Sequence, residues 1–145
     1  MKKSELARLQ IEKAIDLYLE EGDYASSITL AGAAEEMLGN ILRETGKEHI
    51  LAKLHPWFNE RYDTSISFSE LAKGANEVRD ELKHGHVNSS IDFEVEITLA
   101  YCTQMLQRAL LNYLWAVGEP TEKMKLCAKY ISVNYELLFS EWSKT

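Results

Sequence analysis

The sequence predicts an all-α protein, an up-and-down helical bundle of about five long helices that forms a single domain over residues 1–145. Three observations support this prediction. Two prolines and seven glycines are spread over the 145 residues, which leaves long stretches free of helix breakers. Apolar residues recur every three to four positions, the spacing of a helix with one buried face. No segment shows the alternation of apolar and polar residues that is typical of a half-buried strand.

The first two predicted helices have clear start and stop signals. Ser4 can cap a helix that ends near Gly22, because glycine commonly terminates helices. Asp23 then opens a second helix, which runs to about Thr45 and is closed by Gly46. The apolar stripe of this second helix is expected to face the core, and it consists of Leu30, Ala34, Met37, Leu38 and Ile41.

Residues 47–66 are expected to be irregular. The residue before a proline is pushed away from helical angles, so His55 and Pro56 should interrupt any helix there. Ser67 begins the pattern of a capping box, which predicts a third long helix that ends at Gly85. The inward face of that helix is predicted to be Phe68, Leu71, Ala75, Val78 and Leu82.

Two further helices complete the predicted bundle. Asp92 can cap a helix over roughly residues 93–117, which is apolar nearly all round and is broken by Gly118 and Pro120. An extra C-terminal helix, about 121–142, again carries too many large apolar residues for one stripe. Two such helices either bury each other or contribute to an oligomer interface, and the sequence leaves both possibilities open.

Charge and cysteine usage limit the class of protein. A net charge of −7 argues against a broad basic surface that coats nucleic acid, although a small basic site is compatible with it. No run of about eighteen apolar residues and no secretory signal is present, so we expect a cytoplasmic protein without membrane contact. Cys102 and Cys127 lie in apolar helical patterns without CxxC spacing, which favours two reduced core thiols. We expect neither a metal site nor a cofactor.

One flank of the third predicted helix carries the side chains best suited to chemistry. At 100° per residue, Asn76, Arg79, Asp80 and Lys83 fall together beside the apolar face, and His84 lies further round at the helix end. A histidine can exchange a proton near neutral pH, and an arginine can bind a phosphate and offset its charge. Together they could cleave a phosphodiester without a metal ion. The alternative is an ordinary solvated polar face.

The same segment resembles the signature of HEPN domains, in which an arginine and a polar residue precede a histidine. Residues 78–85 read Val-Arg-Asp-Glu-Leu-Lys-His-Gly. The small-residue helix before them, with residues 28–38 reading Ile-Thr-Leu-Ala-Gly-Ala-Ala-Glu-Glu-Met-Leu, resembles the second helix of many bacterial members. The order of helices also matches that family, so the resemblance covers roughly residues 5–117.

The resemblance implies an all-helical domain that usually forms a homodimer and brings two copies of the motif together. Many active members are metal-independent endoribonucleases in toxin–antitoxin or phage-defence systems. An RNA substrate and a cognate antitoxin, or another protein partner, are therefore implied. On this interpretation Arg79 and His84 are the catalytic pair, and Asp80 orients them.

Three more residues are implied to contact the substrate. Lys83 and Asn76 share the flank of Arg79, and Glu35 is the acidic residue that the second helix would add. His86 could assist His84. Other members of the family have lost activity, so the alternative function is a non-catalytic dimerisation module that binds a protein or a nucleotide.

Overall fold

In a computed structural model that describes residues 1–85, 92 and 94–134, every regular element is a helix, which confirms the all-α class. The elements are α1 (Lys3–Asp16), a π-helical turn η1 (Leu17–Glu21), α2 (Tyr24–Glu44), α3 (Ile50–Tyr62), α4 (Phe68–Ala75), α5 (Glu77–His84), α6 (Leu99–Val117) and α7 (Glu122–Asn134). These described residues contain more helices than predicted, because the connector is helical and the third helix is split.

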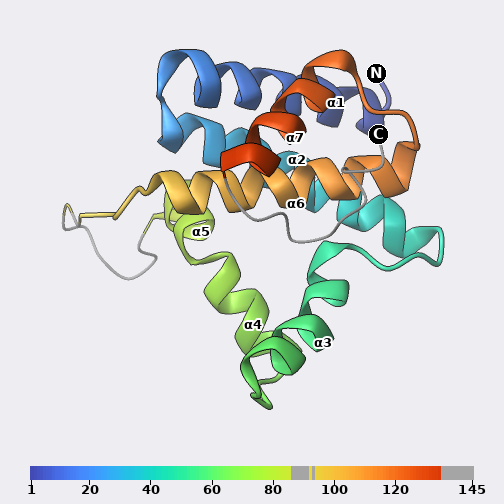
Figure 1. The fold of residues 1–145 in the computed structure, drawn as a ribbon, viewed down its shortest axis with the longest axis vertical. Coiled ribbons are helices and arrows are strands. Elements are labelled where there is room, and N and C mark those ends of the chain that lie inside the picture. Colours follow the sequence, from blue (N-terminus) through green and yellow to red (C-terminus); the bar gives the residue numbers. More distant parts are fainter. Residues whose placement is uncertain (86–91, 93, 135–145) are drawn as a thin grey trace.

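The core lies where α1, α2 and α6 pack together, with α7 lying across α1 and α6 (Figure 1). In contrast, α3 and α4 project from these helices as a V-shaped pair at the bottom of Figure 1. The short helix α5 follows α4 and packs against α2. Helix α5 carries the motif with Arg79 and His84, and it links the core to the projecting pair.

The first two helices begin and end close to the predicted positions. Gly22 has the left-handed backbone that ends η1, at a φ of 67°. The Asp23 side chain accepts a hydrogen bond from the Ser26 amide and caps α2, as predicted. The cap predicted at Ser4 is wrong, because the N-cap residue is Lys2 and α1 therefore begins two residues earlier, at Lys3.

The buried face of α2 differs from the predicted stripe. Leu38 and Ala34 are buried, but Leu30, Met37 and Ile41 are only partly so. The face turned inward is instead rich in small residues and consists of Ser27, Ile28, Ala31, Gly32, Ala34, Glu35, Leu38, Gly39 and Leu42. Small side chains let a neighbouring helix approach α2 closely, so the large residues are displaced to the sides.

The prediction of an irregular connector is wrong, because α3 is helical and contains Pro56. Proline in a helix interior removes one backbone hydrogen bond and costs about 3 kcal/mol. Burial of Ile50, Leu51 and Leu54 in the core offsets this cost. His55 also contributes, because its Nε2 atom is hydrogen-bonded to the Ile66 carbonyl oxygen at 2.7 Å.

The predicted third long helix is divided at Asn76 into α4 and α5. Its start is as predicted, since the Ser67 hydroxyl accepts a hydrogen bond from the Glu70 amide. None of the five residues that were predicted to form its inward face is fully buried. Phe68 is exposed, and the other four predicted residues, Leu71, Ala75, Val78 and Leu82, are partly buried against the core.

Helix α6 begins later than predicted. The Thr98 hydroxyl accepts a hydrogen bond from the Tyr101 amide and caps α6, so the cap predicted at Asp92 is wrong. Helix α6 runs through the centre of the bundle. Leu126 and Val133 of α7 are 66% and 76% exposed, so α6 and α7 do not completely bury each other's apolar residues. Part of the predicted last helix, residues 135–142, lies outside the described residues.

Cys102 and Cys127 are both free and fully buried, in agreement with the prediction of core thiols. Burial raises the pKa of the Cys102 thiol to about 11 and that of the Cys127 thiol to about 12. The thiolate is the reactive form of cysteine, so these side chains are unreactive near neutral pH. Among the described helices, none is long and apolar enough to cross a membrane.

Candidate functional site

The break between α4 and α5 is made by a side chain from another helix. The Tyr101 hydroxyl donates a hydrogen bond to the Ala75 carbonyl oxygen at 2.6 Å and accepts one from the Arg79 amide at 3.3 Å. In a continuous helix that amide would bind that carbonyl directly. The Tyr101 phenol therefore takes the place of one backbone hydrogen bond of the helix and separates α4 from α5. Insertion of a side chain between a backbone donor and its acceptor is a known cause of helix kinks.

Arg79 is held in one place by α2. Its aliphatic chain lies directly over Gly32, where an added Cβ atom would be 2.6 Å from Cδ of Arg79. Its Nη1 atom donates to Glu35 at 3.3 Å, and its Nε and Nη2 atoms donate to Asp80 at 3.2 and 3.0 Å. The Arg79 side chain is only 14% exposed. Arg79 is thus in direct contact with Asp80, the residue that was expected to orient the catalytic pair of Arg79 and His84.

Glu35 binds two arginines with one carboxylate oxygen. Its Oε2 atom accepts hydrogen bonds from Arg79 and, at 3.0 Å, from Nη2 of Arg108. Arg108 comes from the middle of α6 and is 1% exposed. A buried charge is tolerated when it is paired and hydrogen-bonded, and the buried Glu35 carboxylate supplies that partner.

Arg108 also fixes the helix break. Its Nη1 atom donates to the Ala75 carbonyl oxygen at 2.9 Å, and its Nη2 atom donates to Oδ1 of Asn76 at 2.6 Å. Asn76 was predicted to contact substrate, but in the structure its side-chain oxygen is bound to Arg108. Asn76 therefore serves here to hold α4 and α5 against α6.

A second amide extends this polar network across the core. Asn112 lies one helical turn after Arg108 and donates from Nδ2 to the Glu35 carbonyl oxygen at 3.1 Å. Its Oδ1 atom accepts a hydrogen bond from the Ile50 amide at 2.7 Å. Asn112 thereby ties the middle of α2 to the start of α3, since Ile50 is the first residue of that helix.

The two arginines are matched by two carboxylates. Arg79 and Arg108 carry two positive charges, and Glu35 and Asp80 carry two negative charges at neutral pH. Asp80 is the most exposed of the four side chains, at 48%. An ion pair that reaches solvent is weaker than a fully buried one, so Asp80 is the partner that Arg79 can exchange most easily.

The remaining motif residues lie on the surface. Lys83 forms an exposed ion pair with Glu36 at 3.2 Å, which joins α5 to α2 a second time. His84 is the exposed last residue of α5. It lies five residues beyond Arg79, which corresponds to roughly 7.5 Å along the helix axis and about 140° around it. His86 lies outside the described residues.

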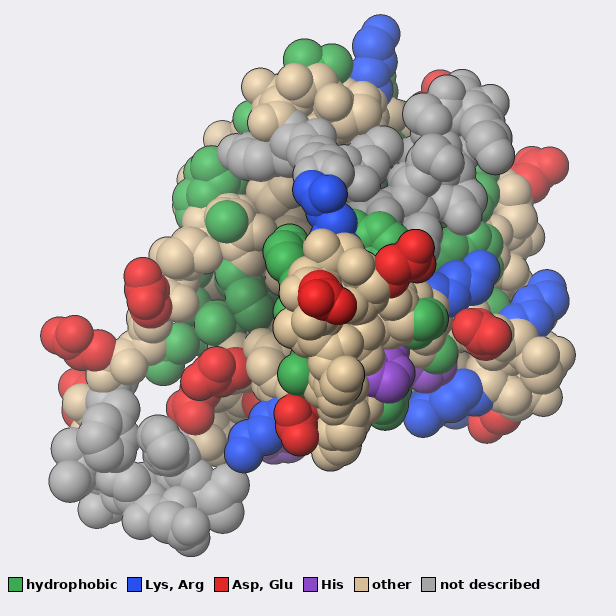
Figure 2. Space-filling view, turned by 60° about the horizontal axis from the view of Figure 1, so that its bottom comes forward, with side chains coloured by type: hydrophobic (Ala, Val, Ile, Leu, Met, Phe, Trp, Pro, Cys, Tyr) green, Lys and Arg blue, Asp and Glu red, His purple; other side chains and the backbone are tan. Residues whose placement is uncertain are grey.

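Acidic residues surround α5. A cleft of about 450 Å³ on one side of α5 is lined by four glutamates together with Val78, Val95, Thr98 and Tyr101. A second cleft of about 510 Å³ is lined by Glu70, Lys73, Gly74, Glu77, Asp80 and Glu81. Figure 2 shows acidic side chains around a hollowed, partly apolar region on the left of the view, the side that carries α5 in Figure 1. Arg79 is therefore a cation within an acidic surface.

Among the described residues, no group of three histidine, cysteine or acidic side chains is arranged to hold a metal ion. His49 and His55 lie on either side of Phe68 in edge-on contacts, with ring centroids 6.2 and 6.0 Å away. Burial is the main cause that lowers the pKa of His49 below its ordinary value, and the nearby Arg43 adds to this effect. These two histidines thus pack α3 against the start of α4.

Sequence reasoning missed Arg108, Asn112 and Tyr101, which organise the site from α6. A signal for them was present, since Tyr101, Arg108 and Asn112 are polar residues at helical spacing within a helix that is otherwise strongly apolar. A buried polar residue is more informative than a buried apolar one, because it requires a partner.

Comparisons with models of known protein families, with curated proteins and with solved structures found no match to this chain.

Proposed function

We propose that the protein is a metal-independent endoribonuclease of the HEPN type, with a composite site at a homodimer interface. One observation carries this proposal. Arg79 is held by the buried Glu35 of α2. Its remaining donors bind the carboxylate of Asp80, which is more exposed and can be replaced. A phosphate that displaces Asp80 would meet an arginine already fixed in position, which favours binding because little side-chain freedom is then lost.

In the proposed reaction the 2′-hydroxyl of RNA attacks the adjacent phosphorus, and the bond to the 5′-oxygen of the next nucleotide breaks. His84 of one chain takes the proton of the 2′-hydroxyl. The leaving oxygen receives a proton from a second His84. Arg79 offsets the charge that builds on the phosphate oxygens. The products are a 2′,3′-cyclic phosphate and a 5′-hydroxyl.

A second copy of the chain is part of this proposal for a geometrical reason. Arg79 and His84 are about 140° apart around α5, and the side-chain hydrogen bonds of Arg79 go to Asp80 and Glu35. Two motif helices that face each other would bring Arg79 of one chain near His84 of the other. Homodimerisation is thus what would complete the site.

The test is incubation of the purified protein with total tRNA and mRNA in EDTA. We expect discrete fragments with 2′,3′-cyclic phosphate ends, and His84→Ala should reduce their rate of formation by about 10²- to 10⁴-fold. In this proposal Asp80 competes with phosphate for Arg79 and does not orient the catalytic pair as the resemblance implied, so Asp80→Asn should increase the rate. Lys47→Ala, a change at an exposed position outside the motif, is the control and should cleave normally. Full activity of His84→Ala would refute the site assignment.

The alternative is a non-catalytic module that binds a protein, and one observation favours it. Each of the two clefts beside α5 is lined by four acidic residues, which would repel RNA and attract a basic segment of a partner. If neither the wild type nor Asp80→Asn cleaves RNA at high concentration, this alternative predicts binding of a lysine- and arginine-rich peptide that weakens as salt is added.

A further inference from the structure

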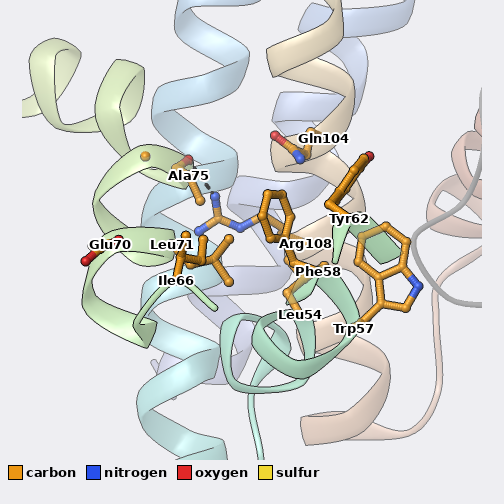
Figure 3. Close-up of a pocket in the computed structure, with 11 residues that line it drawn as sticks. Leu54, Trp57, Phe58, Tyr62, Ile66, Glu70, Leu71, Ala75, Gln104 and Arg108 are labelled. Atoms are coloured by element: carbon orange, nitrogen blue, oxygen red, sulfur yellow. Dashed lines mark hydrogen bonds between the residues drawn. The ribbon is translucent and has the colours of Figure 1, made fainter. Parts of the chain in front are cut away.

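A cleft on the other side of α4 is separate from the motif helix. It lies between α3, α4 and α6, has a volume of about 450 Å³ and is the size of a small-molecule site. Figure 3 shows its two walls, with Ile66, Leu71 and Ala75 on one side and Trp57, Phe58 and Tyr62 on the other. The ring of Tyr62 packs against those of Phe58 and Trp57, with centroid distances of 4.7 and 6.4 Å. These rings form a single aromatic wall.

One buried polar group beside the cleft lacks a partner among the described residues. Arg108 lines the cleft, and its Nε atom is buried without a hydrogen-bond acceptor among the described residues. The other two nitrogens of the same guanidinium group are bound to Ala75, Asn76 and Glu35. A buried donor without a partner costs about 1–3 kcal/mol, so its presence requires an explanation.

Charge indicates the kind of acceptor that would suit this donor. Glu35 already balances Arg108, and Glu70 adds a further carboxylate at the rim of the cleft. An additional anion would be repelled by both carboxylates and would lose its hydration. A neutral carbonyl oxygen can accept the hydrogen bond without either cost. The three rings of the aromatic wall are inclined to one another by 47° and 90°, and such rings favour an aromatic ligand, which they can contact with an offset stack or edge to face.

We propose that the cleft between α3, α4 and α6 binds a small planar molecule whose neutral carbonyl oxygen accepts a hydrogen bond from Nε of Arg108. An aromatic amide or a carbonyl-bearing heterocycle has this chemistry. The proposal does not depend on ribonuclease activity, since none of Arg79, Asp80 and His84 lines this cleft.

Three probes of similar shape test the polar contact in the unaltered protein. These are 1-naphthamide, naphthalene and 1-naphthoate, which carry a neutral carbonyl, no acceptor and a carboxylate. We expect 1-naphthamide to bind at least about tenfold more tightly than naphthalene, as for a hydrogen bond to a charged donor. We expect 1-naphthoate to bind more weakly than 1-naphthamide. The Nε–H signal of Arg108 in ¹⁵N NMR should shift with 1-naphthamide and not with naphthalene.

A blocking variant tests the location. Gly74 lines the cleft, and a Cβ atom added there would meet no atom within 4 Å. Gly74→Leu should therefore fold normally and lose binding of 1-naphthamide. Ser69→Leu adds the same side chain to an exposed position of α4 that does not line the cleft, and it should bind like the wild type.

Three results would overturn the proposal. The first is no detectable binding of any probe at millimolar concentration. The second is equal affinity for 1-naphthamide and naphthalene, which would mean that Arg108 contributes no hydrogen bond. The third is tighter binding of 1-naphthoate, which would show that the site is built for an anion.

Discussion

Adjacent glutamates on α2 have opposite surroundings. Glu35 is buried between two arginines, whereas Glu36 is exposed and pairs with Lys83. The same chemical group at neighbouring positions therefore contributes in different ways. Breaking a buried pair leaves an uncompensated charge away from water, whereas breaking a surface pair leaves two solvated groups.

This contrast predicts different effects for substitutions of the two glutamates. Glu35→Gln should lower the free energy of unfolding by about 3–5 kcal/mol, because Arg108 then remains charged and buried without a carboxylate. Glu36→Gln, the matched control, should change it by about 1 kcal/mol or less. Urea denaturation followed by circular dichroism measures both values. Equal effects of the two variants would contradict the structure of the network.

Some residues of the site were predictable from the sequence and others were not. The caps at Asp23 and Ser67 were predictable because they depend on the neighbouring three residues alone. Helical periodicity placed Arg79 and Asp80 on one flank of their helix, and in the structure the two side chains are hydrogen-bonded to each other. The positions of Glu35 and Arg108 opposite them depend on how α2 and α6 pack, which no local pattern specifies.

At the scale of elements, α2 and α5 meet where a glycine and an arginine are in contact. Gly32 makes room for the chain of Arg79, whereas a Cβ atom added at Gly39, two turns later on the same helix, would be in ordinary contact with Asn112 and His49. Both glycines reduce the intrinsic stability of α2, since glycine is a poor helix former. Only the first of them is needed for the position of α5.

Replacing each glycine by alanine separates these effects. Gly39→Ala should stabilise the protein by up to about 1 kcal/mol, because alanine favours the helix and its Cβ atom fits. Gly32→Ala gains the same propensity, but its Cβ atom overlaps Arg79, so the net effect should be a loss of stability and a displaced α5. Thermal melts of the two variants compare them directly. A higher melting temperature for Gly32→Ala than for Gly39→Ala would contradict this contact.

Two errors of prediction at this scale have one cause. Pro56 and Asn76 were judged from local propensity, which favours a break at the first and continuity at the second. Tertiary contacts reverse both outcomes. Burial of Leu51 and Leu54 keeps α3 helical through its proline, and the Tyr101 hydroxyl interrupts the helix at Asn76. Helix class was therefore predictable, but helix boundaries in this region were not.

For the protein as a whole, the buried thiols make the free energy of unfolding depend on pH in the alkaline range. The pKa of Cys102 is raised to about 11 and that of Cys127 to about 12, chiefly by burial, from an ordinary value near 9.0. Above pH 9.0 the unfolded chain therefore releases protons that the folded chain retains. Proton release by the unfolded state favours unfolding as the pH rises.

The free energy of unfolding should accordingly be insensitive to these thiols below pH 9 and fall between pH 9 and about 12. Burial raises the pKa of Tyr101 and Tyr113 as well, which acts in the same direction at higher pH. Urea denaturation over this range measures the slope. The variant Cys102→Ala/Cys127→Ala should have a smaller slope than the wild type, and an unchanged slope would show that the thiols do not contribute.

The phenol between α4 and α5 also has a consequence for the order of events during folding. The Tyr101 hydroxyl binds positions that lie 26 and 22 residues earlier in the chain, so these bonds form only after α6 has docked. Until then residues 68–84 can form one straight helix, whose direction differs from that of α5. Long-range contacts are slow to form, because the intervening chain must first be ordered. Arg79 and His84 should thus reach their native positions late, after the core of α1, α2 and α6 has already assembled.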